Sequence, residues 1–528
     1  MSNNKTKYIL VFDHGTSGIK AAIVSVYGEV LDFVFQETPL YLLPNGGAEQ
    51  DPNEWWGAII KASKKLIDRD LIPTEDIIAI CCSSQWSGTV PVDENGEHIM
   101  RAMIWLDSRG QSIIRKLMRG RLINLSGYGL LKGLKFLKLT GGAPAMSGKD
   151  PIAHILYIKN EFPEIYNKTY KFLECIDFLN LKFTGKFAAS YNSIILHWVT
   201  DNRDLKNIHY NDSLIKIFGI DKEKLPILKS TIDILGNIKN EVADELGLER
   251  NVKVVMGAPD VPAAAIGSGA VNDYDAHIYI GTSSWLVCHV PFKKTDISHN
   301  MASIPSAIPE KYLLVSEQET AGACLTFLRD NILYHKDELL KEEQLPDVYK
   351  IFDRIIEKVP AGSNNLIFTP WLYGERTPIE DHSVRGGLYN ISLKTTREDI
   401  IRAVFEGVAY NSRWILFWAE KFIGNRKMEP INMIGGGANS DIWCQIFADV
   451  LNRKIRQVKN PIQANAKGAA FIASVGLGYL TFEEIPKYIQ YSNMYVPIKE
   501  NRQIYDKLFK EFLEIYKRNK KMFKRLNH

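Results

Sequence analysis

The chain has 528 residues, which is too long for one ordinary domain and allows either two large α/β domains or about three smaller ones. A hydrophobic content of 45%, a charged content of 24% and a net charge of +4 describe a folded protein and give no case for nucleic-acid binding on charge alone. Uncharged apolar runs are too short to span a bilayer, so we expect no membrane span.

The six cysteines are scattered along the chain and lack the spacing of metal ligands. The first fifteen residues lack the apolar core of a signal peptide. Together these features predict reduced, mostly buried thiols and a cytoplasmic protein.

A turn rich in glycine and hydroxyl residues recurs in the two halves of the chain. The first copy reads DHGTSG at residues 13–18, between two apolar β-type runs, and the second reads GTSS at residues 281–284. Either turn alone is compatible with a plain hairpin. Their recurrence indicates an internal duplication, and two phosphate-binding hairpins facing each other predict a nucleotide site.

One carboxylate, Asp260, follows an apolar run at residues 252–256 that predicts a strand. The small residues at 263–270 predict the start of a closely packed helix. A carboxylate facing a hydroxyl-rich turn suits phosphoryl transfer, because the carboxylate can orient and deprotonate a hydroxyl while backbone N–H groups bind phosphate oxygens. We place the domain boundary just before this segment, which gives domains at residues 1–256 and 257–528.

Strands and helices alternate through both halves. Asp51 and Pro52 have the character of an N-cap and first residue of a helix, and the patterns at 153–162, 166–178 and 397–422 also predict helices. Polar residues follow the predicted strands at 77–82 and 431–434. This alternation predicts open sheets with the functional site at the strand ends. The last thirty or so residues predict an amphipathic helix with Ile504, Leu508, Phe512 and Ile515 on one face and a solvated basic end.

Residues 119–142 differ from the rest of the chain. They are apolar and basic, with Lys132, Lys135 and Lys138 recurring every three residues. One interpretation is an amphipathic surface for a membrane, an anionic ligand or a partner. The other, which we favour from sequence, is a local insertion with a solvated basic face.

Several motifs in one order resemble the FGGY carbohydrate kinases, and among them the xylulose kinases, from about residue 8 to about residue 491, leaving out the basic segment at 119–142. The matching segments are DHGTS at 13–17, EQD at 49–51, WLDSR at 105–109, GAPD at 257–260, GTS at 281–283, GERTP at 374–378 and GGGA at 435–438. The resemblance implies an α/β fold of two ribonuclease-H-like domains, the fold shared by sugar kinases, actin and heat-shock ATPases, with a central cleft. It also implies ATP and Mg²⁺ as cofactors, with the sugar mainly on the first domain and the nucleotide mainly on the second.

The resemblance assigns roles to particular positions. Asp260 is the catalytic base, and Asp13 with Asp260 holds the metal ion. The sugar-side positions are Gln85, Trp86, Ser87, Trp105, Asp107, Asp260 and Val261. For Trp105 the alternative is a core aromatic, and for Asp107 an ion pair with Arg109. The ATP-side positions are Thr16, Ser17, Gly281, Thr282, Ser283, Gly322, Thr326, Gly436, Gly437 and Ser440.

The chain departs from the xylulose-kinase pattern at the sugar side. Ser87 stands where a histidine is usual, and Val261 stands where an asparagine follows the base. Since a site that cannot pair a given hydroxyl discriminates strongly, these changes bear on the substrate. Asn390 replaces a glycine, and asparagine is the best non-glycine choice for a left-handed position.

These observations predict ATP-dependent phosphorylation of a primary hydroxyl of a small sugar, a ketopentose such as xylulose. The alternatives are a kinase of another ketose, a polyol such as glycerol or a sugar acid, and a non-catalytic actin-like regulator that binds ligand. A nucleotide-dependent dehydrogenase is disfavoured because no G-x-G-x-x-G follows the first strand. A homodimer is left open by the sequence.

Overall fold

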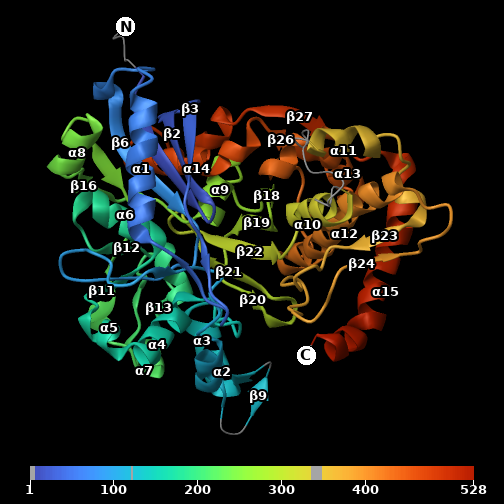
Figure 1. Cartoon of the computed structure of the whole chain (residues 1–528), viewed down its shortest axis with the longest axis horizontal. Helices are drawn as coiled ribbons and strands as arrows, with labels where there is room; N and C mark the ends of the chain where they lie inside the picture. Colours follow the sequence, from blue (N-terminus) through green and yellow to red (C-terminus); the bar gives the residue numbers. More distant parts are fainter. Residues whose placement is uncertain (1–5, 121–122, 126, 334–347, 528) are drawn as a thin grey trace, which may run out of the picture.

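The computed structural model describes residues 6–120, 123–125, 127–333 and 348–527. Two mixed β-sheets dominate it, the first to the left in Figure 1 and the second at the centre and right. The first sheet has the order β16 (Ile234–Asn237), β17 (Lys253–Val255), β6 (Ile77–Ser84), β1 (Tyr8–Gly15), β2 (Gly18–Ser25) and β3 (Val30–Glu37). The second has the order β20 (Thr295–Asp296), β21 (Met301–Pro305), β22 (Tyr312–Gln318), β19 (Ser284–Val290), β18 (Ala276–Ile280), β25 (Ile431–Ile434), β26 (Ile455–Val458) and β27 (Tyr491–Tyr495).

The two sheets repeat one arrangement. In the first, β1, β2 and β3 pair antiparallel, β6 and β17 continue parallel to β1, and β16 closes the edge antiparallel. In the second, β18, β19 and β22 are followed in the same way by β25 and β26, with β27 at the edge. This repeated order confirms the predicted duplication and the α/β fold of two ribonuclease-H-like domains.

Two helices of small residues, α9 (Asp260–Gly267) and α14 (Ala464–Gly476), lie between the sheets (Figure 1). A Cβ atom built on Gly267 would be 1.8 Å from the carbonyl oxygen of Ala464, and one on Gly468 would be 1.9 Å from that of Ala263. Both helices share an apolar cluster with residues of the two sheets. The prediction of a closely packed helix beginning near residues 263–270 is therefore confirmed.

Most of the predicted helices are present, and one is wrong. Asp51 caps α1 (Pro52–Ile67) by accepting from the backbone N–H of Asn53 at 2.9 Å, and α4 (Pro151–Glu161) and α12 (Arg397–Phe422) agree with the expected ranges. The single helix predicted at 166–178 is instead α5 (Pro163–Lys168), β11 (Lys171–Leu173) and α6 (Cys175–Thr184). Pairing of β11 with β7 (Val90–Val92) overrides the local helical pattern.

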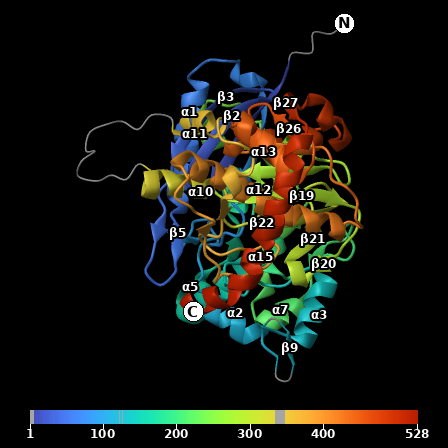
Figure 2. The same cartoon turned by 90° about the vertical axis from the view of Figure 1, so that its right-hand side faces the viewer.

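The C-terminal helix α15 (Arg502–Leu526) runs along the second domain (Figures 1 and 2). It buries Leu508 and Phe512, with Ile504 and Ile515 packed beside them, as the sequence predicts. Asn390 has a φ of +70°, so the left-handed conformation expected there is confirmed. All six cysteines are buried free thiols. In the part of the chain that the structure describes, no helix is both long and apolar enough to cross a membrane.

The other helices are α2 (Gln111–Met118), α3 (Leu130–Leu139), α7 (Asp212–Phe218), α8 (Asn240–Leu246), α10 (Gly322–Phe327), α11 (Val348–Ile356) and α13 (Asp441–Leu451). The remaining strands are short: β4 (Tyr41–Leu42), β5 (Ala48–Gln50), β8 (Ala102–Met103), β9 (Asn124–Leu125), β10 (Tyr128–Gly129), β12 (Ala188–Ser190), β13 (Thr200–Asp201), β14 (His209–Tyr210), β15 (Ile227–Lys229), β23 (Ile367–Thr369) and β24 (Gly387–Tyr389).

Candidate active site

Three neighbouring strands of the first sheet end at one edge and bring the candidate residues there. The parallel register places Asp13 of β1 opposite Ser83 of β6, and Val255 of β17 opposite Cys81 of β6. Residues 85–87 follow β6, and Asp260 follows β17. The carboxyl ends of parallel strands are the usual place for a ligand in an α/β sheet.

Asp260 begins α9, and its Oδ1 accepts a hydrogen bond from the backbone N–H of Val261 at 2.8 Å. Removal from water, and next the negative charge of Asp13, raise the pKa of Asp260 from 3.8 to about 7. Glu317 adds a smaller increase. A partly exposed carboxyl with a pKa near neutrality suits a general base.

Asp13 is buried and has two partners that we did not predict. Its Oδ2 lies 3.2 Å from the ammonium of Lys20, and its Oδ1 accepts from Asn465 at 3.2 Å. The signal for Lys20 was present in the sequence, because a two-residue hairpin turn places Lys20 directly across from Asp13. Asn465 carried no such signal, since it reaches Asp13 only through the packing of α14 on the first sheet.

The first Gly-Thr-Ser turn is held by side chains from other segments. The hydroxyl of Thr16 donates to Oε1 of Gln85 at 3.0 Å and accepts from the indole Nε1 of Trp105 at 2.9 Å. Gln85 also donates to Oε1 of Gln50 at 2.7 Å. Ser17 stands exposed at the tip of the turn. Three of the predicted positions therefore meet, with Gln85 buried beneath the turn and Trp105 partly exposed.

The second turn is attached to the start of α10. The backbone N–H of Gly322 donates to the oxygen of Gly281 at 2.8 Å, and that of Ala321 donates to the oxygen of Thr282 at 2.9 Å. A Cβ atom on Gly322 would be 2.5 Å from the Gly281 oxygen, so only glycine allows this approach. Thr282 is exposed at the tip, and Ser283 accepts from the backbone of Gly281.

A glycine-rich turn separates β25 from α13. Gly435 has a φ of +87°, and no atom lies within 4 Å of a Cβ built on Gly436, whereas one on Gly437 would be 2.4 Å from the side chain of Ile280. Ser440 caps α13, and its hydroxyl donates to Asp353 at 2.6 Å. Thr326 donates to the oxygen of Gly322 at 3.4 Å. This turn offers open backbone at Gly436.

The sugar-side positions after β6 make contacts within the protein. Ser87 has a φ of +68°, and its hydroxyl donates to the backbone oxygen of Lys149 at 2.7 Å. The indole Nε1 of Trp86 donates to the backbone oxygen of Ser193 at 3.1 Å, which leaves the rest of the ring partly exposed. Val261 is buried in the apolar cluster beside Trp86. Trp86, Trp105 and Asp260 are thus the sugar-side positions that remain partly exposed.

The position of Asp107 favours the ion pair with Arg109 over a contact with the sugar. Its side chain is fully buried and accepts from the backbone N–H of Ala48 at 2.9 Å and from the guanidinium of Arg109. Arg109 in turn bonds Glu49 at 2.6 Å. Both oxygens of Asp107 are occupied by protein donors, so the sugar contact expected from sequence is not supported by its position.

A divalent ion at this site would need ligands from a bound substrate in addition to those of the protein. Within the described residues, His, Cys, Asp and Glu side chains do not gather in threes in a way that could hold a metal ion. Asp13 and Asp260 are near enough for one charge to raise the pKa of the other. Mg²⁺ usually binds through one or two carboxylates together with phosphate oxygens and water, and this pair fits that pattern.

Comparison with known proteins agrees with this geometry. Residues 8–267 match the model of the FGGY family of carbohydrate kinases, N-terminal domain, and residues 276–477 match that of the C-terminal domain. The chain belongs to the FGGY family of carbohydrate kinases. Members of this family phosphorylate sugars with ATP, so the chain is a carbohydrate kinase, and the fold, family and enzyme class expected from sequence are confirmed.

Similar proteins cover nearly the whole length of this kinase. A xylulose kinase of Staphylococcus epidermidis is 30% identical over 521 residues, which is 97% of each chain. The crystal structure of a gluconate kinase from Lactobacillus acidophilus has a TM-score of 0.85 at 26% identity and covers 99% of this chain and 100% of its own. The ligand-bound xylulose kinase of the same species has a TM-score of 0.85 at 26% identity and covers 98% and 100%. Relatives named for two different substrates therefore share this fold.

Proposed function

We propose that the protein transfers the γ-phosphoryl group of ATP to a primary hydroxyl of a ketopentose such as xylulose. The observation that carries this proposal is the position of Asp260, whose carboxyl has a pKa of about 7 at the end of β17, next to Asp13 of the first hairpin. Similarity to xylulose kinases over nearly the full chain supports the substrate class.

In the proposed reaction the substrate hydroxyl oxygen attacks the γ-phosphorus. The new oxygen–phosphorus bond forms as the bond from the γ-phosphorus to the bridging oxygen breaks, and ADP leaves with that electron pair. Asp260 orients the hydroxyl and receives its proton. Because the transition state is loose, positioning and charge neutralisation contribute more than proton removal.

Charge neutralisation falls to the first hairpin and its neighbours. Mg²⁺, held by Asp13 and Asp260 together with phosphate oxygens, would supply positive charge to the transferring group. The ammonium of Lys20, the one partly exposed residue of β2, lies beside Asp13 and would add a second cation. Backbone N–H groups of both turns, at Thr16, Ser17, Thr282 and Ser283, would donate to phosphate oxygens, whereas the N–H of Gly281 is used within its turn on the oxygen of Ser283. Gly322, Thr326, Gly436, Gly437 and Ser440 would lie near the nucleoside.

The test is ADP release from ATP with pentuloses, hexuloses, polyols and sugar acids as acceptors. We expect D-xylulose to give the highest kcat/KM. Asp260→Asn should reduce turnover roughly 10²–10⁴-fold, the usual contribution of a general base, without loss of fold. Absence of turnover with xylulose would refute the substrate, and undiminished ADP release by Asp260→Asn would refute the role of Asp260.

A sugar acid is the second candidate, and one contact favours it. The hydroxyl of Ser87, at the position where the sugar-binding histidine is usual, bonds the backbone of Lys149. The ammonium of Lys149 is largely buried and lies 3.9 Å from Glu319, and burial and the charge of Arg376 lower its pKa. A carboxylate would pair with this cation. Lys149→Met should then raise KM for gluconate at least tenfold and leave KM for xylulose unchanged, whereas equal effects on both would remove this candidate.

A further inference from the structure

The segment between Asp107 and Asp150 has a strongly positive net charge, whereas the rest of the chain is net negative. Residues 108–149 contain nine lysines and arginines and no aspartate or glutamate, so the rest of the chain carries a net charge of −5 against +4 overall. Arg121, Leu122 and Ser126 lie outside the described residues. In both views α2, β9 and α3 form the lower end of the molecule (Figures 1 and 2).

Helix α3 is anchored by one face and leaves leucines on the other. Phe136 and Leu139 are buried in the local apolar cluster. Leu131 is 83% exposed and Leu134 is 55% exposed, and Ile123, next to β9, is 63% exposed. Large apolar side chains on one protruding element mark a surface that another body covers.

Cations flank the exposed leucines. Lys138 is exposed and Lys135 partly exposed on the same side of α3, by the 3.6-residue period. Lys132 differs, because its ammonium bonds the backbone oxygens of Leu117 and Arg119 at the end of α2. Leu131, Leu134, Lys135 and Lys138 therefore form the outer face of α3.

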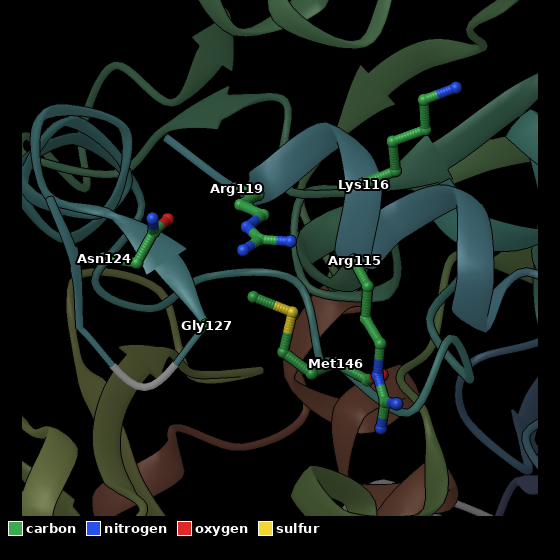
Figure 3. A pocket seen from close by; sticks show the side chains of 6 residues that line it. All are labelled: Arg115, Lys116, Arg119, Asn124, Gly127 and Met146. Carbon is green, nitrogen blue, oxygen red and sulfur yellow. The ribbon is translucent and has the colours of Figure 1, made fainter. Parts of the chain in front are cut away.

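A hollow of about 700 Å³ lies between α2 and β9 (Figure 3), adjacent to α3, whose Lys132 bonds the backbone oxygen of Arg119 at its rim. Arg115 and Arg119 line one side and Asn124 the other. The Arg115 guanidinium uses its Nε on the oxygen of Met146 at 2.9 Å. The side chain of Arg119 makes no hydrogen bond or ion pair with another described residue. Guanidinium groups with free donors bind phosphate oxygens in a fork.

We propose that the outer face of α3 and the adjacent hollow dock on a bilayer that contains anionic phospholipid. The leucines would enter the interface between headgroups and acyl chains, and Arg115 and Arg119 would take a headgroup phosphate. A fluid interface requires no shape complementarity, which suits isolated leucines that stand out from one short helix. A second copy of the chain fits less well, because two surfaces of like charge repel each other.

The test is co-sedimentation of the full-length protein with vesicles. One set contains phosphatidylglycerol and phosphatidylcholine in equal parts, and the other contains phosphatidylcholine alone. The protein should bind the first set and not the second, and the binding should weaken as salt is raised.

Three matched variants locate the surface. Lys135→Gln with Lys138→Gln should weaken binding roughly 25-fold, because each cation near an anionic bilayer contributes about fivefold. Leu131→Gln with Leu134→Gln should weaken it roughly tenfold without changing charge. Lys61→Gln with Lys65→Gln removes two exposed cations from α1 and should leave binding unchanged. Kinase activity and melting temperature without vesicles should be the same for all three.

Three results would overturn the proposal. The first is a failure of the wild-type protein to bind the anionic vesicles, or binding by the α3 variants equal to wild type. The second is a dimer in solution that the leucine variant dissociates, which would make this face a contact between copies. The third is binding to poly-L-glutamate, with the same deficit in both α3 variants, and no binding to vesicles, which would indicate an acidic protein as partner.

Discussion

The negative charge of Asp13 raises the pKa of Asp260, although Asp13 lies on β1 and Asp260 follows β17, and these strands are not neighbours in the sheet. If Asp260 is the base, kcat/KM should fall as the pH drops through about 7, because protonation removes the acceptor. Glu317 also raises this pKa, so Glu317→Gln should move the acidic limb to lower pH. The measurement is kcat/KM from pH 5 to 9 for both proteins. A limb at the same pH in Glu317→Gln would contradict this electrostatic account.

Asp260 should also reduce the stability of the protein at neutral and alkaline pH. Its folded pKa is about 7 and its ordinary value is 3.8, so the folded state holds the proton more tightly and stability declines as pH rises between these values. Asp260→Asn removes this loss. Because the side chain is partly exposed, we expect a gain of about 2 kcal/mol at pH 8 that shrinks toward pH 4. Urea unfolding at the two pH values measures it, and a gain independent of pH would contradict the prediction.

The contact between α9 and α14 should tolerate no side chain at its glycines. Gly468→Ala would place a Cβ 1.9 Å from the backbone oxygen of Ala263, so the helices must separate, at a cost of about 2–3 kcal/mol in the free energy of unfolding. Gly57 is the control, because it lies exposed in α1 with no atom within 4 Å of its Cβ. Gly57→Ala should stabilise by about 0.5–1 kcal/mol. Equal effects of the two variants on thermal unfolding would show that the crossing is not tight.

A substitution at Gly436 should test where the nucleoside binds without affecting the fold. A Cβ at this position meets no protein atom within 4 Å, so Gly436→Ala should leave the melting temperature within about 1 °C of wild type. If the adenosine lies against this backbone, KM for ATP should rise roughly tenfold while KM for the sugar stays constant. Gly437→Ala is the contrast, because its Cβ would meet Ile280 and destabilise the protein. An unchanged KM for ATP would show that the nucleoside does not bind against this backbone.

Sequence patterns sufficed where one local rule decides the structure. Turn-forming residues predict the two turns, helix-capping chemistry predicts the role of Asp51, and helical periodicity predicts the long helix at 397–422. Each of these signals lies within a few residues of the chain. The helix predicted at 166–178 was wrong because β11 is formed by its partner β7, which the local pattern does not contain. Asn465 at Asp13 was missed for the same reason, since a segment 452 residues away supplies it. The leucines of α3 were visible as apolar residues, but which of them are exposed depends on how the helix is anchored.

The role of Asp107 could not be decided from the sequence either, because its motif is compatible with both a sugar contact and an ion pair. The structure buries it against Arg109 and Ala48, so Asp107→Asn should destabilise the protein by about 2–3 kcal/mol, because Arg109 loses one of its two carboxylate partners and keeps only Glu49. The KM for the sugar should stay within about twofold of wild type. Arg109→Met alone should also destabilise, and the double variant should lose less than the sum of the two. Thermal unfolding and steady-state kinetics of the three variants separate the roles. A tenfold rise in the KM for the sugar with an unchanged melting temperature would show instead that Asp107 contacts the substrate.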